Sequence, residues 1–165
     1  PYTTLFRSGS LGQGLSVAIG MALAARTDQK TYRTYCLIGD GETQEGQIWE
    51  AALCAGNYKL GNLCVFLDAN QFQIDGSVKD VMDLEPLAEK FQAFKWNVIE
   101  IDGHDVNAIL QSLQKARSVT DRPTLVLART VKGKGVKFME GDNQWHGKAP
   151  TADQLKQALQ ELANS

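Results

Sequence analysis

The 165-residue sequence has few cysteines, two histidines and no long apolar run, and each shortage excludes a class of protein. Cys36, Cys54 and Cys64 fall inside expected strands and an expected helix, so we expect no disulfide framework and a reducing, cytoplasmic compartment. Their spacing suits no structural zinc site. No run approaches the roughly eighteen apolar residues of a membrane span, and no secretory signal is recognisable. We therefore expect no membrane association.

Excess charge is also missing. The net charge of −2 gives no electrostatic reason to expect nucleic acid or an anionic membrane as a partner. The share of hydrophobic residues, 43%, is that of an ordinary globular chain with a core of its own. We find no internal repeat and no linker composition, so the chain reads as one domain or part of one.

Residues 1–8, PYTTLFRS, differ from the rest of the chain. Back-translated, they match a common sequencing-adapter sequence, and the patterned sequence begins abruptly at Gly9. We expect residues 1–8 to be a non-native sequence scar. Residues 9–165 would then form one N-terminally truncated domain.

The most informative stretch predicts a strand, a helix and a second strand. A short apolar run at 35–38, expected to be a buried strand, ends in a Gly-Asp-Gly turn around Asp40. A helical pattern comes next, and a second apolar run at 63–67 leads to Asn70. Such a βαβ unit has parallel strands that are neighbours or near neighbours. Asp40 and Asn70 should therefore lie at the same edge of the sheet.

One anionic and one neutral side-chain oxygen at this edge, beside a loop with carbonyl groups, are ligands for a hard cation. Magnesium would hold near-octahedral geometry, whereas calcium would tolerate looser packing. A helix that begins through Gly41 would present backbone N–H groups to a phosphate in the same crevice. The simpler alternative is that Asp40 caps the helix, and that Asn70 and Gly76 are only turn-forming residues of a loop.

From Gly9 onward the chain resembles thiamine-diphosphate enzymes, and in detail the transketolase family. A Gly-Asp-Gly followed about thirty residues later by Asn is the diphosphate-binding signature of these enzymes. The matching blocks, in the family's order, are GSLGQGLSVAIGMALA, GDGETQEGQIWEAA, LGNL, DANQFQIDG and TVKGKGVKFMEGDNQWHGKAP. Thiamine is implied only by this resemblance, because the spacing argues for no more than a metal and a phosphate.

The resemblance implies a role for individual residues. The metal ligands would be the side chains of Asp40 and Asn70 and the backbone carbonyl of Phe72. The residues expected to contact the coenzyme are Gly9, Ser10, Leu11, Gly41, Asn70, Ile74, Val131 and His146.

Glu45 and Glu50 resemble glutamates that transketolases place in an acidic network between two active sites at the subunit interface. Five residues apart, they point about 140° apart around a helix and cannot form one carboxylate pair by themselves. The alternative is that Glu45 interacts with the helix dipole and Glu50 lies on a solvated surface.

The two histidines differ in expected role. His104, in Gly-His-Asp before a helix capped by Asp105, reads as a turn residue, and we expect its replacement by alanine to leave turnover largely intact. His146, in Trp-His-Gly, is the catalytic candidate, because imidazole titrates near neutrality and the family places a histidine here by the diphosphate and the sugar. The nearby Lys132 and Lys134 suggest anion contact or a solvated basic loop.

We expect an α/β fold, doubly wound, with a mainly parallel sheet and helices on both faces. Further elements are expected as strands at 96–101 and 124–131, a loop at 117–122, and helices at 15–23, 84–94, 105–113 and 151–162.

By resemblance the chain is the N-terminal subunit of a split transketolase. It would transfer a two-carbon ketol unit from a ketose phosphate to an aldose, with thiamine diphosphate and magnesium. Its partner would be a C-terminal pyrimidine-binding subunit, in a hetero-oligomer with two copies of each. The alternatives are a subunit of another thiamine-diphosphate enzyme, a non-catalytic nucleotide-binding module and a purely structural partner subunit. No Gly-x-Gly-x-x-Gly follows an expected strand, which counts against a Rossmann site.

Overall fold

The structure, a computed structural model, describes residues 11–163. The scar expected at residues 1–8 and the coenzyme contacts expected at Gly9 and Ser10 lie outside the described residues. Within the described part, no helix is long and apolar enough to cross a membrane.

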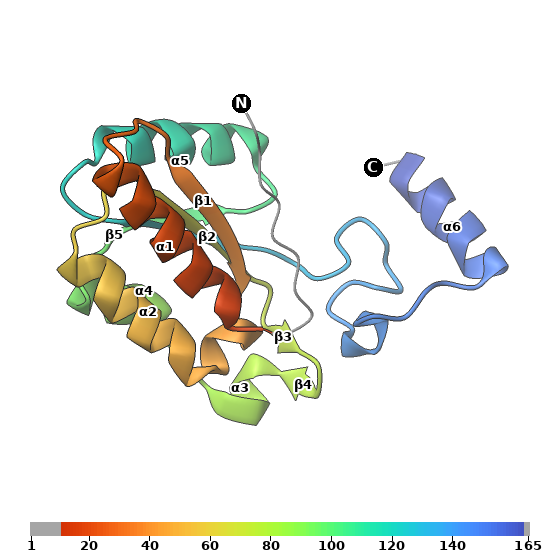
Figure 1. Cartoon of the computed structure of the whole chain (residues 1–165). Coiled ribbons are helices and arrows are strands. Elements are labelled where there is room, and N and C mark those ends of the chain that lie inside the picture. The colour runs from red at the N-terminus through yellow and green to blue at the C-terminus, as the bar shows by residue number, and fades with distance from the viewer. Residues whose placement is uncertain (1–10, 164–165) are drawn as a thin grey trace.

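A four-stranded parallel sheet forms the centre of the molecule (Figure 1). Apolar and β-branched runs form its strands because both faces of a parallel sheet are normally covered by helices. The spatial order of the strands is β1 (Thr34–Gly39), β2 (Leu63–Ala69), β6 (Thr124–Arg129) and β5 (Asn97–Asp102). The first two strands pair in register and in parallel, as the βαβ reading predicted.

Helices pack on both faces of the sheet, which confirms the expected fold class. One face is covered by α1 (Gln13–Thr27), α2 (Gly46–Asn57) and α4 (Leu87–Ala93). The other face is covered by α5 (Val106–Ser118). Smaller elements are the 3₁₀ turns η1 (Gly41–Gln44) and η2 (Asn143–Trp145), the antiparallel pair β3 (Phe72–Gln73) and β4 (Gly76–Ser77), and α3 (Val78–Met82).

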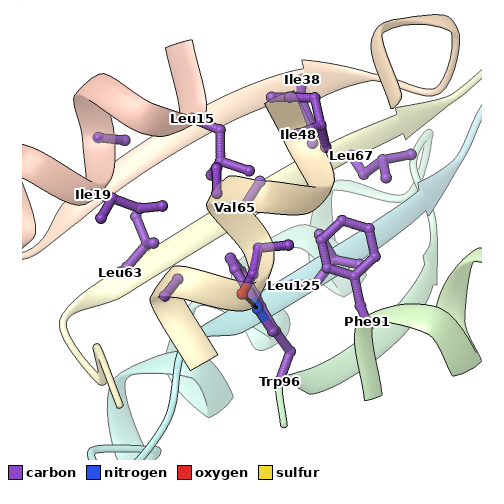
Figure 2. Close-up of a cluster of buried hydrophobic side chains, with 14 of the residues drawn as sticks. Leu15, Ile19, Ile38, Ile48, Leu63, Val65, Leu67, Phe91, Trp96 and Leu125 are labelled. Atoms are coloured by element: carbon purple, nitrogen blue, oxygen red, sulfur yellow. Dashed lines mark hydrogen bonds between the residues drawn. The ribbon is translucent and has the colours of Figure 1, made fainter. Parts of the chain in front are cut away.

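The main core lies between the three-helix layer and the sheet (Figure 2). Leu15 from α1, Ile48 from α2 and Val65 of β2 are fully buried in this core. Phe91 packs edge-on against Trp96, with ring centroids 5.4 Å apart, and the indole N–H of Trp96 donates to the carbonyl of Ala52 at 2.8 Å. Since burial of one such side chain stabilises by about 1.5–3 kcal/mol, this layer holds the strands whose ends form the site.

The prediction that β1 is a buried strand is wrong for one of its faces. Tyr35 is 45% exposed and Leu37 is 72% exposed. The cause is that β1 is an edge strand, and the helix on this face, α5, packs through Ala116 over Cys64 and Val126 instead. All three cysteines are free thiols, as expected, and burial raises the pKa of the Cys64 thiol to about 11.

Several element bounds differ from the predictions. The helix expected from residue 84 begins at Leu87, because Pro86 has no N–H to donate inside a helix. The loop expected at 117–122 begins later, since α5 runs to Ser118. The last strand ends at Arg129, and the final helix, α6 (Ala152–Ala163), stands apart from the sheet in Figure 1.

Candidate functional site

The carboxyl ends of β1 and β2 lie side by side, as the sequence predicted. Gly39 pairs with Asp68 in the ladder, and the N–H of Asp40 donates to the carbonyl of Asp68 at 3.0 Å. Ligands gather at this edge in open α/β sheets, because the loops beyond the strands are the ones that can surround them.

Asp40 is a buried carboxylate held by backbone donors. Its Oδ1 accepts from Gly41 N–H at 2.8 Å and its Oδ2 from Gln71 N–H at 2.6 Å, with the residue only 2% exposed. Burial raises the pKa of the Asp40 carboxyl, and the negative charge of Asp68 adds to this, although the backbone donors act in the opposite direction. No salt bridge among the described residues reaches Asp40. A divalent cation fits this arrangement, since it would compensate both negative charges.

Asn70 is oriented by Asp68. Its amide Nδ2 donates to Asp68 Oδ2 at 3.0 Å, and its Oδ1 accepts from Phe72 N–H at 3.0 Å. The other oxygen of Asp68 accepts from the Thr130 hydroxyl at the end of β6. Because an ionised carboxylate only accepts hydrogen bonds, Asp68 fixes which way the Asn70 amide faces. The sequence analysis missed Asp68, although its place at the end of a strand is the signal that identified Asp40.

The helix that begins at Gly41 is a short 3₁₀ helix and not the expected start of the long helix, and its first N–H is not free for a phosphate. A 3₁₀ turn follows Asp40 and α2 begins only at Gly46, and the Gly41 N–H is bonded by the Asp40 carboxylate. A side chain at Gly41 would meet the Cβ of Gln73 at 2.5 Å and the carbonyl oxygen of Phe72 at 3.5 Å. The backbone of Phe72 therefore lies against the turn that carries Asp40, and its role as a metal ligand stays a prediction.

The N-terminal glycine loop joins this edge through Glu42, a second residue that the sequence analysis missed. Glu42 Oε1 accepts from Gly12 N–H at 2.8 Å, and Oε2 accepts from Gly39 N–H at 3.3 Å. The Gln47 side chain donates to the carbonyl of Gly12 at 2.8 Å. The hydrogen bonds of Glu42 join the glycine loop to the end of β1. Leu11 is 52% exposed, and its contact with the coenzyme stays a prediction.

A cavity of about 430 Å³ is lined by Asp68 and Asn70 but not by Asp40. Its polar side chains come from the ends of β2 and β6 and from the turn after β5. They are Asp68, Asn70, His104, Thr130 and Lys132. Val131 also lines the cavity, and its backbone N–H donates to His104 Nε2.

The loop after β6 brings His146 to this region. His146 Nδ1 lies 3.4 Å from the Lys132 ammonium, with the histidine exposed and the lysine half-buried. The Asn143 side chain donates to the carbonyl of Ile74 at 2.8 Å, which joins the loop to the segment after Asn70. Ile74 and Val131 are 63% and 41% exposed, so both can be reached by a ligand.

Glu45 and Glu50 do not line this cavity. Glu45 is the residue before α2, and Glu50 lies on its exposed surface. Among the described residues, no cluster of three or more His, Cys, Asp and Glu side chains could hold a metal. A cation at this edge would therefore depend on Asp40, on neutral oxygens and on ligands from outside the chain.

Comparisons with known proteins agree with these features. Residues 4–164 match the family model described as the transketolase, thiamine diphosphate binding domain. The chain is 43% identical over 156 residues to one subunit of the apulose-4-phosphate transketolase of Phocaeicola vulgatus, covering 94% of this chain and 56% of that protein. It is 45% identical over 155 residues to the 6-deoxy-6-sulfo-D-fructose transketolase subunit SqwG of a Clostridium species, with the same coverage of 94% and 56%.

The fold is also similar to a solved structure. The transketolase of Campylobacter jejuni superposes with a TM-score of 0.88 at 35% identity, over 94% of this chain and 26% of that one. The chain thus spans about half the length of the curated relatives named above and about a quarter of the solved enzyme.

Proposed function

The chain belongs to the transketolase family as a thiamine diphosphate-binding domain, and on this premise we propose that it is the N-terminal subunit of a split transketolase. In this proposal it works with a C-terminal pyrimidine-binding subunit, in a hetero-oligomer with two copies of each. Together they transfer a two-carbon ketol unit from a ketose phosphate to an aldose. The free thiols fit the cytoplasmic location that belongs to the same proposal.

The observation that carries the proposal is the hydrogen-bonded set Asp40, Asp68 and Asn70 at two adjacent strand ends. A buried carboxylate and an amide oxygen at one edge suit Mg²⁺, and Ca²⁺ less strictly, with the Phe72 carbonyl as the third ligand from the protein. The remaining positions would be filled by water and by the diphosphate.

The division of the enzyme into subunits is supported by the relatives. Two of them are named as transketolase subunits, and this chain matches 56% of each. We assign Glu45 and Glu50, both exposed on or next to α2, to the acidic network at the interface with other subunits. Their exposure leaves them accessible to a partner chain.

When bound, thiamine diphosphate would stabilise a carbanion, which no protein side chain does. The chain itself would bind the diphosphate end, through Gly9, Ser10 and Leu11, through the turn at Gly41, and through Asn70, Ile74, Val131 and His146. Lys132 lines the cavity and offers it a positive charge. His146, beside Lys132, would hold or move a proton on the sugar.

The test is an assay of the full-length native protein with a ketose phosphate, an aldose, thiamine diphosphate and Mg²⁺. This protein is measured alone and then mixed with its pyrimidine-domain partner. We expect turnover only in the mixture, because the pyrimidine end of the coenzyme has its protein contacts on the partner. Turnover by the protein alone would refute the split site. Absence of turnover in the mixture would refute transketolase activity.

A further inference from the structure

His104 makes a contact that its place in a turn did not predict. It lies two residues after the end of β5, and its Nε2 accepts the backbone N–H of Val131 at 2.8 Å. Val131 follows β6, the neighbouring strand. The contact therefore joins the turn after one strand to the loop after another, across 27 residues of sequence.

The turn that carries His104 is fixed from both sides. The N–H of His104 donates to Asp102 Oδ1 at 2.8 Å, and the N–H of Gly103 donates to the carbonyl of Arg129 at 2.8 Å. A side chain at Gly103 would lie 2.4 Å from Thr130 Cγ2, so only glycine lets the turn approach the end of β6 this closely. The imidazole is thus held at the loop by the backbone before it.

The loop in question carries groups that face the cavity. Val131, Lys132 and Gly133 all line it, together with Asp68 and Asn70. Val131 stands outside the β-ladder, so its N–H has no strand partner, and His104 supplies the acceptor instead. Since Nε2 accepts, it carries no proton, and the neutral ring must hold its proton on Nδ1.

We propose that His104 is a positioning residue: it fixes residues 131–133, and through them the Lys132 ammonium, at the cavity where an anionic ligand binds. The identity of that ligand, the coenzyme diphosphate with Mg²⁺, rests on the proposed function. The hydrogen bond from Val131 to His104 does not depend on the proposed function. The proposal changes the sequence-based expectation, because His104 acts on ligand binding through Val131 and not only as a turn residue.

The test compares two substitutions of an exposed side chain, so that the core is unaffected. His104→Leu removes the acceptor, whereas His104→Gln keeps one at similar reach. Asp105→Ala is the matched control: it removes the cap of α5, where Asp105 Oδ1 accepts from Asn107 and Ala108, but leaves the His104 acceptor in place. Each variant is examined for Val131 amide exchange by NMR and for thermal stability. Its thiamine diphosphate affinity with Mg²⁺ is measured by calorimetry after mixing with the pyrimidine-domain partner.

We expect His104→Leu to speed Val131 exchange and to weaken coenzyme binding, each by about two- to tenfold, the range of one net hydrogen bond. His104→Gln should restore most of both. Asp105→Ala should lower the melting temperature without either effect. In the unaltered chain, imidazole ¹⁵N shifts should show the proton on Nδ1.

The outcomes separate the two proposals. Unchanged Val131 exchange in His104→Leu would refute the contact, whatever the chain binds. Faster exchange with unchanged affinity would refute the positioning role and leave the proposed function standing. If the unaltered protein bound no coenzyme even when mixed with its pyrimidine-domain partner, the proposed function would fail, and the positioning role for that ligand would fail with it.

Discussion

The two halves of the candidate site are built in different ways. The strand-end half, formed by Asp40, Asp68 and Asn70, sits directly on two adjacent strands over the main core. The loop half, residues 131–163, leaves the sheet after β6 and carries His146 and α6. Figure 1 shows this segment extending away from the body of the molecule.

The loop half depends mainly on contacts within itself. The Trp145 indole donates to the Phe138 carbonyl at 2.9 Å, and the two rings stack edge-on at 5.3 Å. Helix α6 buries only Ala158 among its described residues. Leu155 and Leu159 on this helix are 49% and 58% exposed.

This contrast separates metal binding from catalysis. The side chains proposed for the metal, Asp40 and Asn70, are fixed by the fold, because their strands cannot move without opening the core. The proposed catalytic histidine is held by a loop with few links to the sheet. Its final position would therefore depend on ligand and partner, as is common for catalytic groups carried on loops.

The largest effect is expected in the loop half. His146→Ala should lower turnover of the mixed enzyme by about 10²–10⁴, the usual contribution of a positioned acid or base. The chain should stay folded, since the His146 side chain is exposed. Steady-state kinetics with coenzyme affinity measured in parallel would check this.

His104→Ala is the matched control for that prediction, because it is an exposed histidine at the same edge. It should leave turnover at saturating coenzyme largely intact. Equal losses of turnover in the two variants would mean that the ranking of the histidines is wrong.

The next effect belongs to the strand-end half. Asp40→Ala and Asn70→Ala should each weaken Mg²⁺-dependent coenzyme binding by at least about 10–100-fold, since even a residue behind a metal ligand has an effect of this size. Phe72→Leu should change little, because its backbone carbonyl is the proposed ligand. Calorimetry with and without Mg²⁺ measures all three. If coenzyme affinity were unchanged in both alanine variants and independent of Mg²⁺, the assignment of the metal site would be wrong.

How much of this could be read from the sequence depends on the same contrast. Parallel neighbouring strands necessarily bring their carboxyl ends together, so periodicity and two polar residues placed Asp40 and Asn70 correctly. The contacts of Glu42, Asp68 and His104 were not found because their partners lie 30, 62 and 27 residues away. Those contacts require the strand order, with β6 between β2 and β5, and periodicity gives the strands without their order.

A smaller effect concerns the pH dependence of the strand-end half. Burial raises the pKa of Asp40 on folding, so its contribution to stability is present below its ordinary pKa and is lost as the pH rises through the raised value. Bound Mg²⁺ would offset this loss, because it favours the ionised carboxylate. The stabilisation by Mg²⁺ should therefore increase as the pH rises from the ordinary aspartate pKa through the raised pKa of Asp40. Melting curves with and without Mg²⁺ across this pH range measure it, and Asp40→Ala, the control, should show no such dependence.

The smallest effect would loosen the loop half alone. Glu161 on α6 accepts the backbone N–H of Lys137 through Oε2 at 2.6 Å and is held by Gln157, which donates to Oε1 at 2.9 Å. Hydrogen bonds from Gln157 and Lys137 lower the pKa of Glu161, so this contact is present above the ordinary glutamate pKa and is lost as the pH falls through the lowered value.

Glu161→Ala should therefore speed proteolysis and amide exchange in residues 137–163 while the melting temperature of the sheet stays unchanged. Glu161→Gln, which keeps an acceptor, is the control and should behave more like the unaltered chain. If the two halves were in fact one cooperative unit, Glu161→Ala would change exchange in β1 and β2 as well, and the contrast drawn between them would fail. If exchange changes only in the loop half, His146 is carried by a segment that opens independently of the metal site, which is the condition for a partner chain to position it.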